Sequence, residues 1–411
     1  MDISHRKINK RVQFVDANNQ PIAGKQVQIK QTNHSFLFGC GAFDFIPYVN
    51  SDDEQMLQYK PDFNIDEYKQ LTDSWLEIFN YGTLPFYWGN FEPEEGKLDT
   101  EKLMKTAQYL KSKNVTVKGH PLCWHTVCAD WLMQYDNETI LKKQLARIDR
   151  EVEGFKGVID MWDVINEVVI MPIFDKYDNA VTRLCKEHGR VGLIKKVFDE
   201  AYKCNPEATL LLNDFNTSVN YEILIDGCLN AGVPISAIGI QSHQHQGYWG
   251  KEKLEEVLDR FSSFGLPIHF TENTLISGDI MPAYIEDLND WQVDEWPSTP
   301  EGEERQAKEI EEMYRTLFAH PLVEAITTWD YRDGAWLKAP SGFIRLDNSL
   351  KPSYKMLKKL VREEWWTDTV VTTDAEGYAQ VEAFKGDYNI IVDGNETAVT
   401  LKDDSIEKIS L

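Results

Sequence analysis

The sequence predicts an α/β protein: a (β/α)8 TIM barrel joined to a small β module, which the C-terminal segment builds and to which we expect the N-terminal segment to contribute. Between residues 36 and 331, eight short apolar stretches alternate with segments of amphipathic helical pattern. Parallel strands that are buried on both faces have this near-continuous apolar character. No Gly-x-Gly-x-x-Gly motif follows the first stretch, which weakens the alternative of an open doubly wound sheet.

Residues 1–34 are predicted to form N-terminal β strands. Apolar and β-branched residues gather at 12–15 and 27–29, and the stretch 16–24 between them is rich in Asp, Asn, Pro and Gly. Such a stretch between two apolar runs favours a turn between strands. We expect an edge or a piece of a small sheet here, without catalytic residues.

Residues 35–366 form the predicted catalytic barrel. Its candidate strands are 36–43, 80–88, 115–124, 158–167, 209–216, 237–244, 267–274 and 323–331. The segments between them carry apolar residues at helical spacing, as Leu193, Val197 and Ala201 do, which buries one face of each helix against a sheet. Before the last strand, Thr299-Pro300-Glu301 supplies a cap, a first-turn proline and an acidic first turn for a helix.

Past Trp366 the pattern returns to β structure. Short β-prone runs at 369–373, 378–381, 388–392 and 398–401 are separated by turns rich in Asp and Gly. We interpret 367–411 as a small β module to which the strands of 1–34 are added, so that it ties the two chain ends together. Its few aromatic residues favour a structural brace over a carbohydrate-binding platform.

Composition narrows the choice of partner. The 411 residues carry a formal net charge of −24, and aromatic residues are plentiful, with 12 Trp and 17 Tyr. Nucleic acids and anionic membranes require basic surface, so neither is an expected partner. An acidic chain rich in aromatic residues is compatible with a neutral, hydroxyl-rich ligand such as a sugar polymer. A monomer is the default expectation.

Targeting and metal signals are weak. No apolar run approaches the roughly 20 residues that span a bilayer, and the N-terminus lacks the apolar core of a secretory signal. The protein is therefore expected to be cytoplasmic, or secreted with its signal removed. Six scattered cysteines favour reduced thiols, and Cys123 and Cys128 lack a second pair of ligands at zinc-site spacing, so we expect no metal.

Two glutamates occupy the positions where a barrel carries its chemistry. Glu167 ends the apolar run 158–165 and Glu272 follows 266–271, and the working residues of a barrel lie at the C-terminal ends of its strands. Glycoside hydrolysis requires such a pair, with one carboxylic acid to protonate the leaving oxygen and one carboxylate to act as base or nucleophile.

Other polar and aromatic residues share the same strand ends. Singly, each is more often a core or surface residue than a catalytic one, but together they line one face of the predicted barrel. The indoles offer flat apolar surfaces on which sugar rings stack. The set consists of His120, Trp124, Asn166, Gln241, His243, Trp329 and Trp336.

The order and spacing of these segments resemble family 10 of the glycoside hydrolases, the family of retaining endo-β-1,4-xylanases, across roughly residues 36–364. The matching segments are Gly119-His-Pro-Leu-Cys-Trp-His125, Asp130-Trp-Leu132, Trp162-Asp-Val-Ile-Asn-Glu167, Asn213-Asp-Phe-Asn216, Gly239-Ile-Gln-Ser-His243, Thr271-Glu272 and Trp329.

The resemblance implies a role for each residue. Glu167 would be the general acid/base, Glu272 the nucleophile, and Asn166 a partner of the sugar 2-hydroxyl. His120 and Trp124 would line the −1 sugar pocket, which Trp329 and Trp336 would wall. Gln241 and His243 would orient or contact the nucleophile. No metal or organic cofactor is implied.

The chain departs from the family pattern in four places, one of which is Phe215, which replaces a Tyr. Where the family carries Glu-Asn-Glu-Met-Lys-Trp, this chain has Thr83-Leu-Pro-Phe-Tyr-Trp88, so Leu84 and Tyr87 replace a polar −2 clamp and Tyr87 becomes a candidate substrate contact. Thr274 replaces the acid that would help to hold His243. The long segment 275–298, with two Trp, is either a new cleft wall or a solvent-facing loop.

Three functions remain open. The first is retaining hydrolysis of β-1,4-linked xylan or xylo-oligosaccharides. The second is the same mechanism on a different or decorated β-glycoside, which the altered −2 region and the added segment favour. The third is a carbohydrate-binding barrel without turnover, against which the intact glutamate pair argues.

Overall fold

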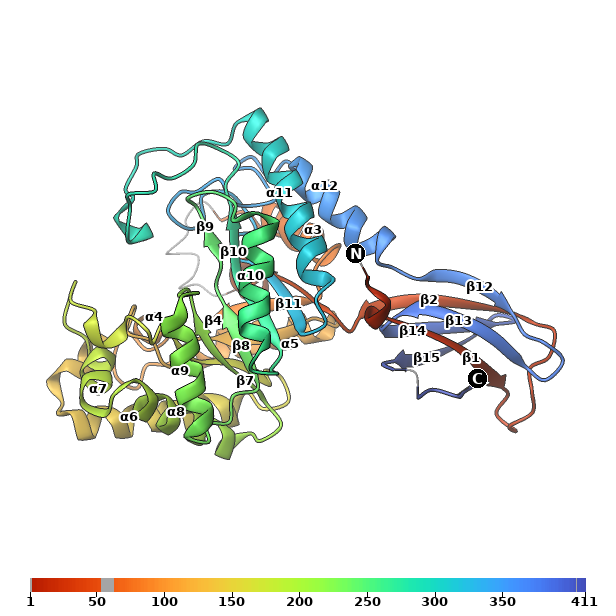
Figure 1. Ribbon diagram of the computed structural model, residues 1–411, viewed down its shortest axis with the longest axis horizontal. Coiled ribbons are helices and arrows are strands. Elements are labelled where there is room, and N and C mark those ends of the chain that lie inside the picture. The colour runs from red at the N-terminus through yellow and green to blue at the C-terminus, as the bar shows by residue number, and fades with distance from the viewer. Residues whose placement is uncertain (1, 53–62, 404) are drawn as a thin grey trace.

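The structure is a computed structural model that describes residues 2–52, 63–403 and 405–411, and it places a barrel beside an elongated β module (Figure 1). In the described part of the chain, eight parallel strands form the barrel in chain order, and the last pairs with the first. They are β3 (Leu37–Gly41), β4 (Tyr81–Pro85), β5 (Thr116–His120), β6 (Met161–Asn166), β7 (Thr209–Asp214), β8 (Ala237–Ile240), β10 (Ile268–Leu275) and β11 (Val323–Thr328). The predicted fold class is confirmed, and each predicted barrel strand is present. β10 is shifted by one residue at each end, and the other seven strands have shorter bounds.

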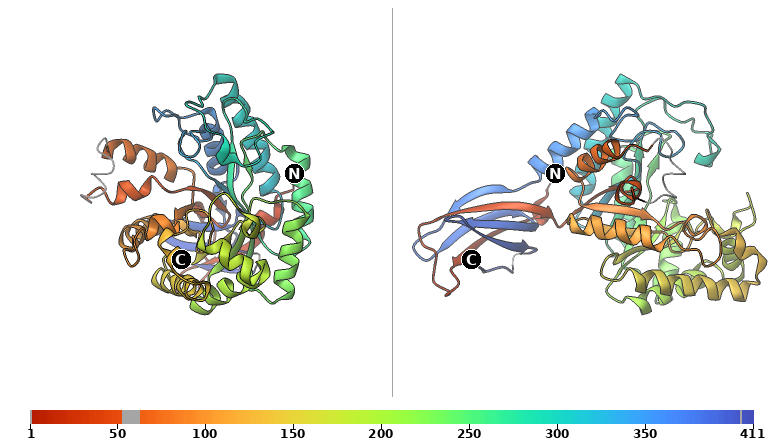
Figure 2. Two further views of the ribbon diagram at one scale, coloured as in Figure 1. Left: turned by 90° about the vertical axis from the view of Figure 1, so that its left-hand side faces the viewer. Right: turned by 180° about the vertical axis from the view of Figure 1, so that it is seen from behind.

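Helices surround the barrel, as the view into its mouth shows (Figure 2, left). They are α1 (Phe45–Val49), α3 (Ile65–Leu76), α4 (Trp88–Phe91), α5 (Thr100–Ser112), α6 (Asn137–Gly154), α7 (Ala180–His188), α8 (Arg190–Cys204), α9 (Val219–Asn230), α10 (Gly250–Ser262), α11 (Pro300–Phe318) and α12 (Pro352–Lys359). The predicted stripe at 193–201 is buried on α8. Thr299 caps α11 as predicted, because its hydroxyl accepts the Gly302 N–H at 3.0 Å.

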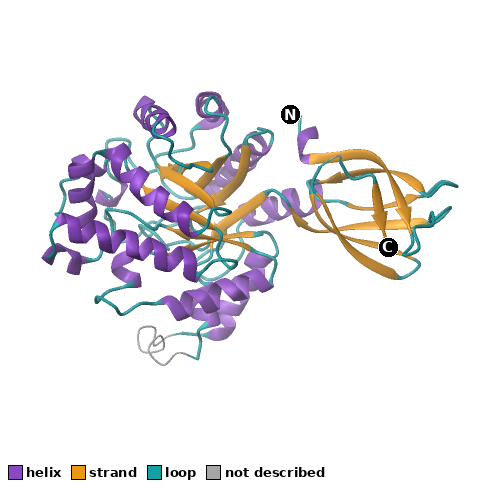
Figure 3. Ribbon diagram, turned by 90° about the horizontal axis from the view of Figure 1, so that it is seen from below, coloured by secondary structure: helices purple, strands orange, loops and turns teal. Residues whose placement is uncertain are grey.

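Both chain ends contribute strands to the β module, as predicted. One sheet has the order β12–β2–β14–β15 and the other β13–β1–β16. The strands are β1 (Lys7–Val15), β2 (Gln26–His34), β12 (Asp368–Thr372), β13 (Tyr378–Phe384), β14 (Gly386–Val392), β15 (Asn395–Leu401) and β16 (Lys408–Ser410). The module buries a core of its own around Ile8, Val12, Ile29 and Ile390, and its strands lie apart from those of the barrel (Figure 3).

The module joins the barrel at the N-terminal ends of the barrel strands, away from the mouth. β2 ends at His34, just before β3 begins. Phe318 stacks on Trp365 with 3.9 Å between ring centroids. The Arg6 guanidinium donates to the carbonyls of Phe318, His320 and Val323 at 2.6–2.9 Å. These contacts anchor the module to the N-terminal ends of the barrel strands, which we call the barrel floor.

The segment that follows β10 is folded and packed. Residues 276–298, which we call the β10 insert, contain the short helix η4 (Leu288–Asp290) and contribute to a small apolar cluster around Ile276, Met281 and Trp296. Trp296 is 8% exposed, and its indole N–H donates to the Asp279 carbonyl at 2.8 Å. The packing of Ile276, Met281 and Trp296 disfavours the alternative of a merely solvent-facing loop. No helix in the described ranges is long and apolar enough to cross a membrane.

Candidate active site

The mouth of the barrel brings together all ten residues that the sequence singled out, among them both glutamates. Glu167 directly follows β6 and takes a left-handed backbone conformation with φ of 58°. This region is sparsely populated by non-glycine residues, and such strain is found most often at functional sites. The turn lifts the Glu167 carboxyl out of the sheet, and its backbone N–H remains fixed to the Asn213 carbonyl at 2.9 Å.

The Glu167 carboxyl receives two side-chain hydrogen bonds. Gln241 Nε2 donates to Oε1 at 3.0 Å, and the Trp124 indole N–H donates to Oε2 at 2.9 Å. Burial raises the pKa of Glu167 to about 8, and the negative charge of Glu272 adds to the rise while these two hydrogen bonds oppose it. Glu167 therefore carries a proton at neutral pH, as a general acid must.

Glu272 lies within β10 and is 4% exposed. Asn213 Nδ2 lies 2.7 Å from its Oε1, and His243 Nε2 lies 3.2 Å from its Oε2. Burial alone would raise the pKa of this carboxyl, but positive charge on His120, the His243 hydrogen bond and more distant Lys118 together lower it below its usual range. Glu272 is therefore ionised at neutral pH, as a nucleophile must be.

A buried charged cluster supports Glu272 from below. His120 Nδ1 lies 2.7 Å from Asp163 Oδ2 and 4.0 Å from Glu272 Oε1. The Lys118 ammonium lies 2.7 Å from the same Asp163 oxygen, and both of these side chains are fully buried. Although burial raises the pKa of Asp163, Lys118 and His120 outweigh it and lower that pKa.

Within the described ranges, two groups of three side chains have the spacing of a metal site. One combines Asp149, Glu200 and Cys204 at the surface, and the other combines His120, Asp163 and Glu272 in the mouth. At the second, the Lys118 ammonium already supplies a positive charge to Asp163.

Amide side chains connect the two glutamates. Gln241 was expected to orient or contact the nucleophile, and its backbone carbonyl accepts the Glu272 N–H at 3.1 Å. Its side chain donates to Glu167 and to Asn166 Oδ1, both at 3.0 Å. Asn213 was not singled out, yet it donates both to Glu272 and, at 2.9 Å, to Asn166 Oδ1. Its position at the end of β7, matching that of Asn166 at the end of β6, was the available sequence signal.

Aromatic side chains wall the space above the carboxyls. Tyr87 lies edge-on to His120 with 5.8 Å between ring centroids, and 5.7 Å from Trp124. Trp329 packs edge-on to His120 at 5.3 Å. These rings offer the flat apolar surfaces that sugar rings prefer.

Beyond Glu272, a chain of polar contacts leads towards the β10 insert. The Thr274 hydroxyl lies 3.5 Å from His243 Nδ1 and 3.1 Å from His245 Nδ1. Burial lowers the pKa of His245 to about 3, so this imidazole is neutral. The His245 ring lies 5.0 Å from Trp336 and 6.0 Å from Trp296 of the insert. Thr274 thus supports two imidazoles at a position where the family pattern has an acid.

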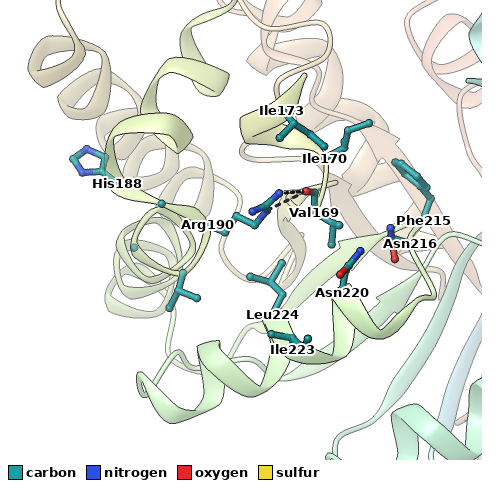
Figure 4. A pocket seen from close by; sticks show the side chains of 13 residues that line it. Val169, Ile170, Ile173, His188, Arg190, Phe215, Asn216, Asn220, Ile223 and Leu224 are labelled. Atoms are coloured by element: carbon teal, nitrogen blue, oxygen red, sulfur yellow. Dashed lines mark hydrogen bonds between the residues drawn. The ribbon is translucent and has the colours of Figure 1, made fainter. Parts of the chain in front are cut away.

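A separate hollow of about 690 Å³ lies beside the mouth, between the loops after β6 and β7 and helices α8 and α9 (Figure 4). Its wall is largely aliphatic, with Ile173, Ile223 and Leu224, and Arg190 donates to the Val169 carbonyl at its edge. None of the ten predicted site residues lines it, so it is distinct from the glutamate pair.

A parallel barrel with two glutamates at its strand ends, one with a raised and one with a lowered pKa and with indoles beside them, has the arrangement of the two-carboxyl glycoside hydrolases. The sequence model described as glycosyl hydrolase family 10 matches residues 85–359. The chain belongs to glycosyl hydrolase family 10.

Individual relatives are distant. Endo-1,4-beta-xylanase A of Caldicellulosiruptor saccharolyticus is 25% identical over 264 residues, which cover 59% of this chain and 72% of that protein. Anti-sigma-I factor RsgI6 of Acetivibrio thermocellus is 25% identical over 394 residues, which cover 94% of this chain but 45% of that protein. The chain therefore spans less than half of the latter relative.

Solved structures agree on the fold. A family 10 structure from Paenibacillus barcinonensis superimposes with a TM-score of 0.63 at 22% identity, covering 80% of this chain and 95% of that one. Native xylanase 10B from Thermotoga maritima gives a TM-score of 0.61 at 20% identity, covering 80% of this chain and 96% of that one.

Proposed function

We propose that this protein is a retaining glycoside hydrolase that cleaves β-1,4-xylosidic bonds in xylan or xylo-oligosaccharides. The observation that carries the proposal is the opposite protonation of the two glutamates, because a raised pKa at Glu167 and a lowered one at Glu272 suit an acid and a nucleophile. Two relatives of comparable length are named endo-1,4-beta-xylanase. We further propose that residues 35–366 form the catalytic domain, between the N-terminal strands of 1–34 and the β module of 367–411.

In the first step, the Glu272 carboxylate attacks the anomeric carbon of the −1 sugar. The glycosidic carbon–oxygen bond breaks as Glu167 gives its proton to the leaving oxygen, and a glycosyl–Glu272 ester remains. In the second step, the Glu167 carboxylate takes a proton from water, whose oxygen attacks the anomeric carbon and releases Glu272. Two inversions give net retention of configuration.

The remaining predicted residues position the sugar. Asn166 lies beside the acid and would bond the 2-hydroxyl, while His120, Trp124, Trp329 and Trp336 would enclose the −1 ring. His243 and Asn213 hold the Glu272 carboxylate. Tyr87 would contact the glycan in place of the family lysine, leaving that part of the site without a cation.

The test is product release from xylan, arabinoxylan, glucuronoxylan, mixed-linkage glucan and aryl β-xylosides, comparing the wild-type protein with Glu272→Ala. We expect xylo-oligosaccharides from the wild-type protein alone, with the β anomer formed first in proton NMR spectra. Glu363→Ala, a change in the five-residue π-helix η5 (Leu360–Glu364), is a control that should behave as wild type. Activity on another β-glycoside alone would keep the mechanism and replace the substrate.

A second candidate is a carbohydrate-binding barrel without turnover. This candidate is motivated by the relative named as an anti-sigma factor, which matches 94% of this chain and whose name does not describe a hydrolase. Binding of xylo-oligosaccharides without product release, equal in wild type and Glu272→Ala, would establish this alternative and exclude the first.

A further inference from the structure

The β10 insert is held rigidly on one side of the mouth. At its base, Ser277 N–H donates to the Pro340 carbonyl at 2.9 Å, and the Ser277 hydroxyl accepts from the buried Lys351 ammonium at 2.8 Å. At its far end, Thr299 N–H returns to the Ser277 carbonyl at 2.8 Å. Lys338 also donates to two insert carbonyls at 3.0 and 3.1 Å. The insert is therefore a folded wall with both ends fixed.

The loop after β6 forms the opposite wall. It includes the short helix η3 (Met171–Ile173) and ends where Asn179 caps α7 by accepting the Thr182 N–H at 2.8 Å. Between them, Phe174 packs on the buried ring of His125 with 4.5 Å between centroids, and Tyr177 packs on Phe174 at 4.8 Å. Lys176 is therefore presented from a loop that is itself held at both sides.

An ion-pair bridge connects these two walls. Lys176 Nζ lies 2.6 Å from Asp287 Oδ2 and 2.7 Å from Asp290 Oδ1, both in the insert. The other oxygen of Asp287 accepts the Asn289 N–H at 2.9 Å, which orients the carboxylate. Two carboxylates thus converge on one ammonium from across the mouth.

The bridge joins the segments that follow β6 and β10, the two strands that bring Glu167 and Glu272 to the mouth. Strand β6 precedes Glu167 and β10 contains Glu272, and the two strands are separated by β7 and β8 in the barrel order. In Figure 1 the insert, drawn in teal, hangs over the mouth from above, and the loop after β6, drawn in yellow-green, rises towards it from below. A glycan bound between the two glutamates is expected to pass between these walls.

We propose that Lys176, Asp287 and Asp290 close the cleft over the glycan, so that this enzyme acts on oligosaccharides and free chain ends in preference to the interior of long chains. This inference rests on the proposed xylan hydrolysis and specifies its substrate class. A chain interior can enter a cleft only sideways, which requires the bridge to open, whereas a short or terminal segment can enter lengthwise beneath it.

The bridge can open at modest cost. The Lys176, Asp287 and Asp290 side chains are 42%, 34% and 62% exposed, and ion pairs at such exposure are individually weak and screened by salt. The preference for chain ends should therefore be partial, and removal of the bridge should change it by about three- to fivefold.

The experiment compares wild type with Lys176→Met and with Asp287→Asn/Asp290→Asn. The control is Lys195→Met, which removes a similarly exposed lysine paired with Asp199 on α8. For each protein, loss of viscosity of soluble xylan is measured per reducing end released, along with kcat/KM on xylotriose. We expect the viscosity of the xylan solution to fall about three- to fivefold faster per reducing end with both bridge variants than with wild type. The value of kcat/KM on xylotriose should stay within about twofold of wild type. Wild type in 0.5 M NaCl should move towards the variants, and Lys195→Met should match wild type.

Equal viscosity loss per reducing end in wild type and both bridge variants would overturn the inference while leaving hydrolysis intact. If wild type hydrolyses no glycan, the proposed function fails, and the bridge is then tested by retardation of the same proteins in native gels containing soluble xylan. Stronger retardation of the bridge variants than of wild type would support closure, and equal retardation would overturn it. Absence of retardation for wild type and every variant would show that the mouth does not bind xylan. It would then overturn the closure of the cleft as well as the proposed function.

Discussion

Glu167 and Glu272 are chemically identical side chains in different electrostatic surroundings. Neutral donors, Gln241 and Trp124, contact Glu167, whereas His120 and His243 bring positive charge and a hydrogen bond to Glu272. The difference separates the pKa values of two neighbouring carboxyls, which supports the proposed roles of Glu167 as the acid and Glu272 as the nucleophile.

This separation predicts the pH dependence of activity. Because Glu167 must be protonated, kcat/KM should fall as the pH rises through about 8, and because Glu272 must be ionised, the acid limb should lie below pH 4.5. Glu167→Gln should lower kcat on unactivated xylosides by about 10²–10⁴-fold. It should have much less effect on formation of the glycosyl–enzyme from dinitrophenyl xyloside, whose leaving group needs no proton.

Glu167→Gln also tests the raised pKa of Glu167 through the pH dependence of stability, without an activity measurement. The pKa of Glu167 is raised on folding, so its favourable contribution to stability is complete below the unfolded value near 4.5 and is lost as the pH rises through about 8. The difference between the melting temperature of Glu167→Gln and that of wild type should therefore shift in favour of the variant as the pH rises from 5 to 9. A constant difference across this range would contradict the raised pKa.

Single residues also mark the limit of prediction from sequence. Strand ends were enough to select both glutamates and their aromatic neighbours, because parallel strands bring their C-terminal ends to one face. Gln241 contacts the nucleophile residue through its backbone, because its carbonyl accepts the Glu272 N–H at 3.1 Å. That its side chain reaches Glu167 was not predicted, since which of two nearby carboxyls an amide reaches depends on backbone turns such as the one at Glu167. The buried Lys118–Asp163 pair was not predicted, because both residues lie within strands whose other residues are mostly those of a buried core.

At the level of elements, the β10 insert depends on the start of the helix that follows it. Thr299 caps α11, and Pro300 fills its first position. Thr299→Ala should cost about 1 kcal/mol, the usual effect of removing a cap, which corresponds to a fall of about 2–4 °C in melting temperature. Thr299→Ser should restore most of the loss, and equal melting of both variants would contradict a capping role for the hydroxyl.

Elements differ in how far the sequence defines them. The amphipathic stripe of α8 and the apolar runs of the barrel strands were recognisable because burial on one or two faces imposes a period. The insert has no such period, and its fold depends on distant contacts such as that between Ser277 and Lys351. Its two Trp residues indicated buried structure but could not indicate which wall they would build.

At the level of the whole molecule, the module and the barrel have separate cores joined at the barrel floor. Ile29 is fully buried in the module, and Ile29→Ala should destabilise it by about 2–5 kcal/mol. Because the mouth lies at the other end of the barrel strands, kcat/KM at 25 °C should stay within about twofold of wild type. Thermal unfolding and xylanase assays on the same sample provide the measurement.

Val370→Ala is the matched control for this change, since Val370 lies on the same module but is 55% exposed. It should leave both melting and activity unchanged within about 0.5 kcal/mol of stability. Loss of activity in Ile29→Ala at a temperature where the barrel remains folded would show that the module reaches the mouth after all. The pairing of the chain ends was predictable from their β pattern, but their position at the floor follows from the anchoring contacts of Arg6.

The gathering of both chain ends at the floor has a practical consequence. β1 pairs with β16, so the first and last strands lie side by side in one sheet, on the far side of the barrel from the mouth (Figure 1). A tether placed at either end would hold the molecule by its module and leave the mouth turned towards the solution. Immobilised on a solid support through either terminus, the protein should meet soluble glycans with its cleft facing outward.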